Sequence, residues 1–344
     1  MIQVAKPDIR EEDIAAVDAV IRSGWTTGGQ KVAELEEALQ PWMGGEVVVC
    51  SSATAGLHMA LMAMEYAGMY KTPTVPAFTW TATANVVEMV CGGVAFCDVD
   101  PDTYNVEGIV NIGVSLFGRP FEGHCHIDDA ACAFGANPLV TNDSRMALVV
   151  SFHPRKACSG GEGGAIATND PKLARKLRAL RNHGMVDGRL LMPGLNYRMT
   201  DIQAALLLGQ IRRYDETLKR RREVARTYLD ELAGVGWLKL PQWHDQHVWQ
   251  SFVCRAYAPG TTKPPRPYDQ SRWAAMMLLK DNGVETTVGT QCVPRLDYYR
   301  GKYGFEDGDF PVAEALADDT LSLPVHSRMT DSDLSAVIEA VKAI

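Results

Sequence analysis

Short apolar segments alternate with helical segments along the first half of the chain, and this alternation constrains the fold more than any other feature. Segments with the length and composition of β-strands occupy residues 46–50, 74–76, 94–99 and 109–116, and helical patterns lie among them at residues 55–67 and 81–90. Such alternation is typical of a mostly parallel α/β sheet flanked by helices. In a sheet of this kind, ligands bind where the carboxyl ends of the strands meet.

The second half of the chain indicates a further, smaller domain. A helix is predicted from Asp170, which caps it, and a capping box begins a long helix over residues 200–232. The composition then shifts to strand and loop patterns that contain proline and glycine. We therefore predict a large cofactor-binding domain at residues 1–235 and a smaller α+β domain at residues 236–344.

The composition argues against several classes of protein. With 46% apolar and 22% charged residues, the 344-residue chain has the composition of an ordinary globular protein. Its formal net charge of −8 disfavours a nucleic-acid partner, because binding to a phosphate backbone requires a basic surface. The basic run at residues 219–222 lies within the long helical pattern, and we expect it to form a solvated helix face.

Cysteine usage and hydropathy indicate a reducing compartment. Eight cysteines are present and none forms a CxxC pair, so a structural zinc site is not expected. No apolar run is long enough to span a bilayer, and the first residues lack the apolar core of a signal peptide. We expect a cytoplasmic protein that binds no membrane.

One lysine lies in a glycine-rich turn, away from any predicted helix. Lys156 follows the apolar run at residues 147–150 and precedes four glycines within residues 160–164. A lysine in a pocket of low dielectric constant can lose its proton and become a nucleophile toward an aldehyde. This is the chemistry of a Schiff base with pyridoxal 5'-phosphate (PLP), and the alternative is a turn lysine beside a flexible loop.

A PLP site also requires a phosphate-binding turn, an aromatic side chain and a carboxylate. Residues 51–56 stand between a strand and a helix, where backbone N–H groups bind phosphate, although an ordinary helix cap has the same pattern. Trp80 can stack on a planar ring or be a buried core residue. Asp129 ends an apolar strand and can pair with the pyridine nitrogen, or simply begin a loop.

Two further polar segments admit other ligands. The histidines, cysteine and aspartate within residues 124–128 suggest a metal cluster, but strand neighbours point to opposite faces, so we expect no metal site. Asn196 and Arg198 precede the capping box and can bind a phosphate and a carboxylate, or be ordinary polar loop residues.

Taken in order, these segments resemble the DegT/DnrJ/EryC1/StrS family of sugar aminotransferases, which are PLP enzymes of fold type I. The resemblance extends over nearly the whole chain, with motifs at residues 24–29, 31–36, 51–55, 76–80, 98–101, 116–120, 129–131, 151–156, 181–185, 196–199 and 321–324. It implies an α/β fold with a mostly parallel central sheet flanked by helices and a smaller C-terminal domain. It also implies a homodimer in which the two chains share each active site.

The resemblance implies a role for each candidate residue. Lys156 corresponds to the lysine that forms the internal aldimine, Asp129 to the acid beside the pyridine nitrogen, and Trp80 to the stacking aromatic. Asn196 corresponds to an asparagine that reaches the phosphate bound by the partner chain. Other positions are expected to bind the phosphate (Ala53, Thr54, Ala55 and Ser151), to lie beside the cofactor (Cys132) or to contact substrate (Thr26, Thr27 and Arg198).

Three positions depart from the family's usual pattern. Ala53 replaces a glycine of the phosphate-binding turn, which is tolerable if the backbone there avoids positive φ. Cys132 stands where glutamine or histidine is usual, and a thiol is a weaker hydrogen-bond partner for the cofactor. Ser115 replaces a common histidine. These departures concern the identity of the substrate more than cofactor binding.

The implied reaction transfers an amino group from L-glutamate or L-glutamine to a keto sugar that is linked to a nucleotide. Lys156 separates this activity from the sugar dehydratases of the family, which carry histidine at that position. Two alternatives stay open at this point, namely an aminotransferase that acts on a cyclitol or another ketone, and a non-catalytic ligand-binding homologue.

Overall fold

A computed structural model represents the chain, and it describes all residues except 140–142, 144 and 258–270. Its central sheet has five strands, in the spatial order β1 (Glu46–Cys50), β8 (Gly164–Thr168), β7 (Ala147–Ser151), β6 (Ile127–Asp129) and β5 (Ile112–Val114). β8 is antiparallel to both of its neighbours, while the other four strands run in one direction. The predicted mostly parallel α/β fold is therefore confirmed, with one reversed strand.

Two short strand pairs extend this part of the molecule. β2 (Thr74–Pro76) pairs in parallel with β4 (Ala95–Cys97) and packs beside β5. β3 (Phe78–Thr79) pairs with β14 (Gln291–Cys292), which comes from the C-terminal part of the chain.

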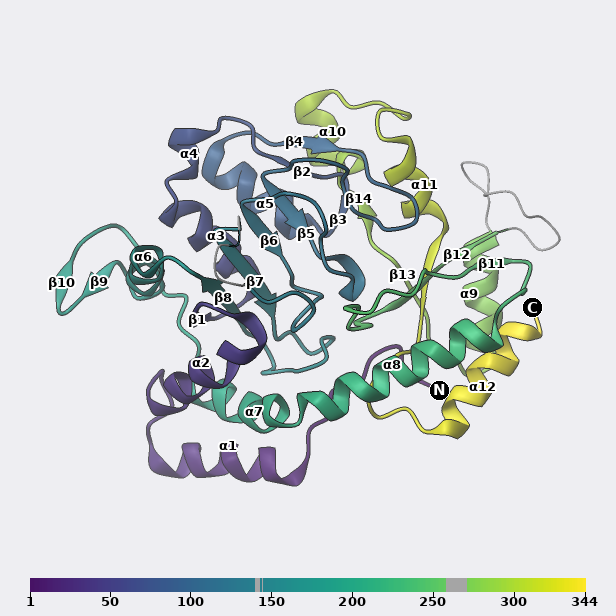
Figure 1. Cartoon of the computed structure of the whole chain (residues 1–344), viewed down its shortest axis with the longest axis horizontal. Coiled ribbons are helices and arrows are strands. Elements are labelled where there is room, and N and C mark those ends of the chain that lie inside the picture. The colour runs from purple at the N-terminus through teal and green to yellow at the C-terminus, as the bar shows by residue number, and fades with distance from the viewer. Residues whose placement is uncertain (140–142, 144, 258–270) are drawn as a thin grey trace.

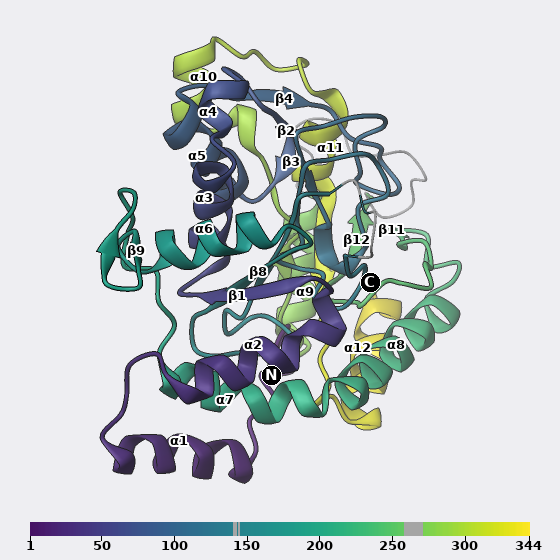
Figure 2. The ribbon, with the colours of Figure 1, turned by 60° about the vertical axis from the view of Figure 1, so that its left-hand side comes forward.

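Helices cover both faces of the central sheet, because the side chains of each strand alternate between the faces. Along β1, Val47 and Val49 join one buried cluster, whereas Val48 and Cys50 join the other. The first cluster is closed by α2 (Gln30–Met43) and α7 (Asp201–Arg212), and the second by α3 (Ala53–Ala63), α5 (Thr81–Cys91) and α6 (Pro171–Arg181). α1 (Glu11–Ser23) packs on α7 as an outer layer (Figure 1, Figure 2).

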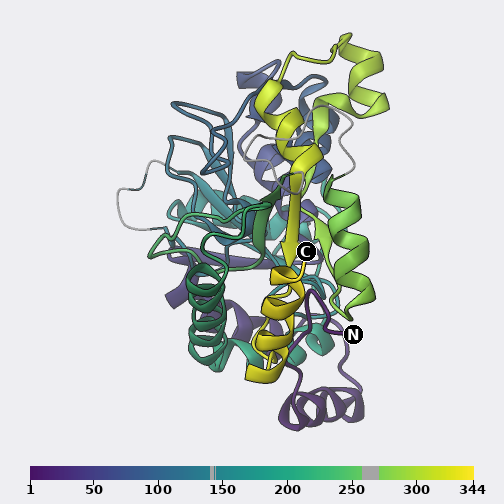
Figure 3. The same cartoon turned by 90° about the vertical axis from the view of Figure 1, so that its right-hand side faces the viewer.

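The C-terminal part contains a second sheet, which is antiparallel. Its strands lie in the order β11 (Leu238–Lys239), β12 (Phe252–Ala256), β15 (Thr320–Leu323) and β13 (Thr287–Val288). α8 (Tyr214–Glu231), α9 (Ser271–Asp281) and α12 (Asp331–Lys342) share a buried cluster with this sheet (Figure 3). The predicted domain boundary at residue 235 stays a prediction, and the buried cluster already begins within α8, at Val224.

The remaining elements are short. They are α4 (Tyr66–Met69), α10 (Asp297–Tyr303), α11 (Pro311–Asp319), the 3-10 turns η1 (Leu116–Gly118) and η2 (Val293–Arg295), and the hairpin strands β9 (Met185–Val186) and β10 (Arg189–Leu190). In the part of the chain that the structure describes, none of the helices combines the length and the apolar character that crossing a membrane requires.

The long helix predicted over residues 200–232 is in fact two helices. α7 ends at Arg212 and α8 begins at Tyr214, because Arg213 leaves helical geometry with φ −110° and ψ 20°. The guanidinium of Arg213 pairs with the fully buried carboxylate of Asp13 in α1. A tertiary ion pair thus accompanies the break in a pattern that local propensity would continue.

One other expectation was wrong in detail. Arg221, within the basic run expected to be solvated, is 2% exposed, and its guanidinium donates to backbone carbonyls. Between α6 and α7, residues 185–190 form the β9–β10 hairpin. Asp187 and Gly188 both have positive φ at its tip, and an Asp-Gly pair is a strong hairpin signal in sequence.

The first residue of β8 has no room for a side chain. A Cβ atom at Gly164 would lie 2.5 Å from the backbone nitrogen of Ala53 and 2.5 Å from the carbonyl carbon of Ser52. The first turn of α3 therefore lies directly on the start of β8. Gly56, one turn later, is similarly close, because its Cβ would lie 2.9 Å from a side-chain carbon of Val149.

We predict that Gly164→Ala destabilises the protein by about 1–3 kcal/mol, because rigid backbone must move to admit the methyl group. The measurement is the free energy of unfolding in urea. Gly301→Ala is the matched control, since Gly301 lies in α10 with nothing within 4 Å of its Cβ position. Equal stability of the Gly164 variant and the control would contradict the close approach of α3 to β8.

Candidate active site

Three of the predicted segments meet at one edge of the central sheet. β1, β6 and β7 run in the same direction and end at Cys50, Asp129 and Ser151. Cys50 and Ser151 both pair with Gly164, so the turn after β1 and the end of β7 flank the start of β8. This is the edge at which α/β sheets bind ligands.

The N-terminus of α3 presents free hydrogen-bond donors at this edge. Ser52 caps the helix, since its hydroxyl oxygen accepts from the N–H of Ala55 at 3.1 Å. The N–H groups of Ala53 and Thr54 have no partner among the described residues. Unpaired N–H groups and the helix dipole favour an anion at this position. Ala53 is not among the residues with positive φ, so its replacement of glycine causes no strain.

Asp129 is a buried carboxylate with two hydrogen bonds. Its oxygens accept from the hydroxyl of Thr83 at 2.7 Å and from the N–H of Ala131 at 3.2 Å, and the residue is 6% exposed. Burial raises the pKa of Asp129, and the hydrogen bond from Thr83 opposes that rise. A carboxylate in this setting is well placed to pair with a cation, because a positive partner offsets the cost of burying its charge.

Sequence reasoning missed Thr83. It lies in the first turn of α5, three residues after Trp80, and its hydroxyl is fully buried beside that of Thr79 at 3.3 Å. No local pattern singled out Thr83, because its partner Asp129 lies 46 residues further along the chain.

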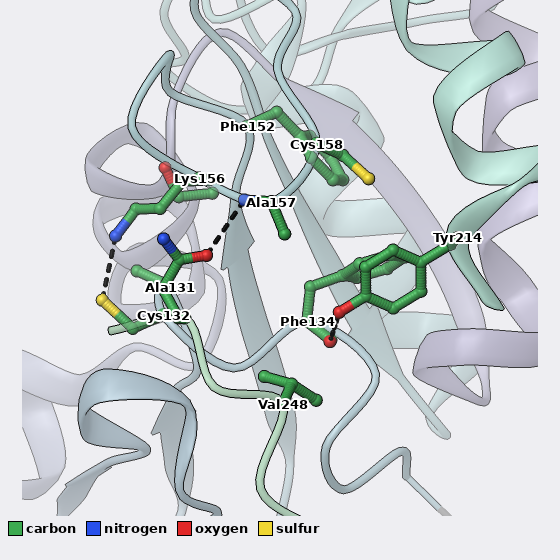
Figure 4. A pocket seen from close by; sticks show the side chains of 11 residues that line it. Ala131, Cys132, Phe134, Phe152, Lys156, Ala157, Cys158, Tyr214 and Val248 are labelled. Atoms are coloured by element: carbon green, nitrogen blue, oxygen red, sulfur yellow. Dashed lines mark hydrogen bonds between the residues drawn. The ribbon is translucent and has the colours of Figure 1, made fainter. Parts of the chain in front are cut away.

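Lys156 lies in the loop between β7 and β8, and its amine points toward Cys132. The Nζ atom donates to the Sγ atom of Cys132 at 2.9 Å (Figure 4). Both residues line a small pocket, with Phe134 and Tyr214 at its other end (Figure 4). Cys132 follows Asp129 by three residues in the chain, and the positive charge of Lys156 opposes the rise that burial causes in the pKa of Asp129.

The two departures at Cys132 and Ser115 have different structural roles. Cys132 contacts the candidate lysine directly. Ser115 is buried, and its hydroxyl donates to Asp128 at 2.8 Å and accepts from the N–H of Phe121 at 2.8 Å. Ser115 therefore ties the end of β5 to Asp128 in β6 and makes no contact with Lys156.

Trp80 stands at the start of α5 and is 61% exposed. Its indole is not part of the core, so the alternative interpretation of a buried aromatic is wrong. The exposed indole is available to cover a planar ring, and α5, which follows it, carries the Thr83 that bonds to Asp129.

The remaining predicted residues surround this edge at varying distance. Ser151 is half-buried, and its hydroxyl oxygen accepts from the N–H of His153 at 3.3 Å. Asn196 is exposed, while the neighbouring carbonyl of Tyr197 accepts from the N–H of Ser51 at 2.9 Å. The loop that carries Asn196 and Arg198 therefore lies beside the predicted phosphate-binding turn of its own chain.

Arg198 and the two threonines have few contacts with the rest of the chain. Arg198 Nη1 donates to the side-chain oxygen of Asn182 at 2.6 Å, and the residue is half-buried. Thr26 and Thr27 are exposed between α1 and α2. The structure of one chain does not bring these three side chains to Lys156.

The side chains of residues 124–128 bind partners in different places. His126 Nδ1 lies 2.6 Å from the hydroxyl of Tyr66, and Asp128 pairs with Arg145 at 3.1 Å. Burial raises the pKa of Asp128 to about 6, although Arg145 lowers it. Within the described ranges, no three histidine, cysteine or acidic side chains gather in a group that could hold a metal ion.

The residues at this edge fit PLP. The free N–H groups of α3 suit a phosphate, the buried Asp129 suits a protonated pyridine nitrogen, and the amine of Lys156 suits the aldehyde carbon. These three groups come from segments at residues 53–54, 129 and 156, and the shared direction of the strands brings them together.

The chain is similar to several solved aminotransferases. A DegT DnrJ EryC1 StrS aminotransferase from Brucella abortus is 27% identical, with a TM-score of 0.82 over 96% of this chain and 95% of that one. DesV from S. venezuelae is 25% identical, with a TM-score of 0.84 over 100% and 98% of the two chains. The putative sugar aminotransferase Spr1654 from Streptococcus pneumoniae has the same fold, with 24% identity and a TM-score of 0.86 over 99% and 96%.

The family model of the DegT/DnrJ/EryC1/StrS aminotransferases matches residues 7–109 and 123–342. These ranges include every candidate site residue named above and most of the chain. The match confirms the predicted fold type, the predicted enzyme class and the predicted cofactor. The chain is a PLP-dependent transaminase that belongs to the DegT/DnrJ/EryC1/StrS aminotransferase family.

Proposed function

We propose that this enzyme transfers an amino group from L-glutamate or L-glutamine to a keto sugar linked to a nucleotide, and that Lys156 and Asp129 are its catalytic residues. The observation that carries the proposal is the placement of the Lys156 amine near a buried carboxylate, at the edge where α3 presents two free N–H groups. The 27% identical relative is an aminotransferase, and DesV, which is 25% identical, was solved in a complex that contains a reaction intermediate.

Asp129 and Lys156 have different roles in the proposed reaction. PLP, when bound, supplies an electron sink that stabilises negative charge on the substrate carbon. Asp129 holds a proton on the ring nitrogen, because its buried carboxylate requires a positive partner. Lys156 Nζ, once free of the cofactor, moves a proton between the substrate carbon and the cofactor's C4' atom.

Other residues hold and orient the cofactor. The N–H groups of Ala53 and Thr54, with the hydroxyl of Ser151, bind the phosphate, and Ala55 keeps the first turn of α3 small. Trp80 covers one face of the ring and excludes water from it. Cys132 accepts a hydrogen bond from the Lys156 amine and would offer its thiol to the cofactor's phenolic oxygen. Arg198, whose guanidinium retains free donors beside its bond to Asn182, binds the carboxylate of the amino donor.

We also propose a homodimer with shared active sites. Large apolar side chains are exposed on α1 and around the β9–β10 hairpin, namely Ile14, Ile21, Trp25, Leu190, Leu191 and Leu195. Exposed apolar surface of this kind marks interaction sites. In the dimer, Asn196 reaches the phosphate bound by the partner chain, and Thr26 and Thr27 face the acceptor sugar from the dimer seam.

We place the enzyme in the cytoplasm. All eight cysteines are free thiols, and burial raises the pKa of seven of them. Thiols that remain reduced are typical of a reducing compartment.

The half-reactions test the function. Glutamate or glutamine should bleach the visible absorbance of the lysine-bound cofactor, and a keto sugar nucleotide should restore it. Lys156→Ala should show no such band and should lose at least about a thousandfold in turnover, because no other amine takes over its proton transfer. The measurement is the absorbance spectrum during alternate additions of donor and acceptor.

Two comparisons make this test specific. Lys172→Ala is the control, because the Lys172 side chain is exposed at the start of α6. Recovery of the band with cyclitol ketones, but with no keto sugar nucleotide, would replace the proposed acceptor class. Full turnover in Lys156→Ala would overturn the assignment of the catalytic lysine.

Asp129→Asn should stabilise the protein without cofactor and impair the loaded enzyme. Because the pKa of Asp129 is raised in the folded chain, the folded chain binds this proton more tightly than the unfolded chain. The stability that protonated Asp129 contributes to the folded chain is therefore present below about pH 4 and is lost as the pH rises through the raised pKa. Asparagine removes that loss, so the melting temperature of the apoprotein should exceed that of the wild type at pH 7 but not at pH 4. The turnover of the loaded variant should fall about a hundredfold or more.

Mixed dimers test the shared site. Asn196→Asp should weaken phosphate binding by repulsion, and Lys156→Ala should be inactive in its own dimers. In a dimer of one Asn196→Asp chain and one Lys156→Ala chain, one of the two sites contains both an intact lysine and an intact asparagine. After random exchange of subunits, half of the dimers are of this mixed kind, so about a quarter of the wild-type activity should return. Activity that stays at the average of the two parent variants would show that each site is built from a single chain.

A further inference from the structure

The side chain of Gln250 contacts the backbone on both sides of Lys156. Its Nε2 atom donates to the carbonyl oxygen of Arg155 at 2.8 Å, and its Oε1 atom accepts from the N–H of Ala157 at 2.9 Å. Gln250 is 8% exposed, so water has little access to its two hydrogen bonds. A single amide thus binds the residue before and the residue after the lysine.

These two backbone groups have no other partner among the described residues. The nearest backbone bonds in the loop run from the N–H of Lys156 to His153 at 2.8 Å and from the N–H of Gly160 to Phe152 at 3.0 Å. The loop then continues through glycines, which restrain the chain weakly. Without Gln250, the peptide groups that flank Lys156 would lose their direct tie to the rest of the protein.

The backbone of Gln250 is itself held from two directions. Arg221, which is fully buried in α8, donates to the carbonyl oxygens of Trp249 at 2.8 Å and Gln250 at 3.2 Å. The N–H of Ser251 donates to the carbonyl of Phe117, just after β5, at 3.0 Å. Trp249 adopts a φ of 49°, which is unusual for a bulky residue and requires surrounding contacts to hold it.

We propose that Gln250 is a positioning residue that fixes the direction of the Lys156 side chain. The inference rests on the proposed catalytic role of Lys156. A lysine side chain has four rotatable bonds, so small shifts of its Cα atom and of the adjacent peptide planes become large shifts of Nζ. Reactions of a held group lose about a hundredfold in rate when the group is misplaced by about 1 Å. Gln250 prevents such shifts because it restrains both adjacent peptides at once.

A second glutamine provides a matched control on the same loop. Gln210 in α7 donates from Nε2 to the carbonyl of Ser159 at 2.8 Å and accepts from the N–H of Ser159 at 3.0 Å. Gln210 is 3% exposed, so its burial resembles that of Gln250. It restrains the loop three residues beyond Lys156, without contacting the adjacent peptides.

The experiment compares Gln250→Met with Gln210→Met, since methionine keeps the volume of glutamine and removes both hydrogen bonds. In the apoprotein, amide hydrogen exchange resolved to single residues should rise about tenfold at Ala157 in the Gln250 variant and at Ser159 in the Gln210 variant. In the loaded enzyme, Gln250→Met should lower kcat about 10- to 100-fold with KM nearly unchanged, and should shift the pH midpoint of the visible band. Gln210→Met should change kcat by no more than about threefold.

Gln250→Glu provides a second variant if Gln250→Met fails to fold. It keeps an acceptor for the N–H of Ala157 and loses the donor to Arg155, so its kcat should lie between those of the wild type and the methionine variant. Unchanged exchange at Ala157, or equal losses of kcat in the Gln250 and Gln210 variants, would overturn the positioning role. Failure of the proposed function would instead appear in the wild type, as the lack of a visible band or of any response to an amino donor.

Discussion

The site depends on the reversed direction of β8. Because β8 is antiparallel to β7, the connection between them leaves and re-enters the sheet at the same edge, and Lys156 stays there. A parallel connection would have to cross to the opposite edge of the sheet. The reversal also places Gly164, the first residue of β8, under the first turn of α3. One strand direction therefore brings the lysine loop and the phosphate-binding turn together.

Charge is distributed unequally between the two adjacent acids at the end of β6. Neighbouring strand residues face opposite sides, so Asp128 and Asp129 have separate partners. Asp128 receives hydrogen bonds from Arg145 and Ser115, which compensate its charge within the protein. Asp129 receives hydrogen bonds from Thr83 and Ala131, both of them neutral donors. Among the described residues, the carboxylate of Asp129 therefore has no hydrogen bond from a cation, unlike that of Asp128.

The sequence predicted the features that depend on neighbours along the chain. The alternation of strands and helices, the glycine turn at Lys156 and the strand end at Asp129 were all local patterns, and the family motifs related them to one another. Contacts between segments that are distant in the chain produce no local pattern in the sequence, so they were not predicted. The break at Arg213 comes with an ion pair to Asp13, 200 residues away, and the burial of Arg221 involves carbonyls of three distant residues. Gln250 lies in a segment without any periodic pattern, so its bonds to Arg155 and Ala157 were not predictable.

The lysine loop also joins the two sheets. Gln250 lies two residues before the start of β12, and Arg155 Nη2 donates to the hydroxyl of Thr287 in β13 at 3.4 Å. β12 and β13 both pair with β15, so the two contacts on the loop come from one antiparallel sheet. Any shift of that sheet relative to the central sheet therefore changes the peptides on both sides of Lys156 together.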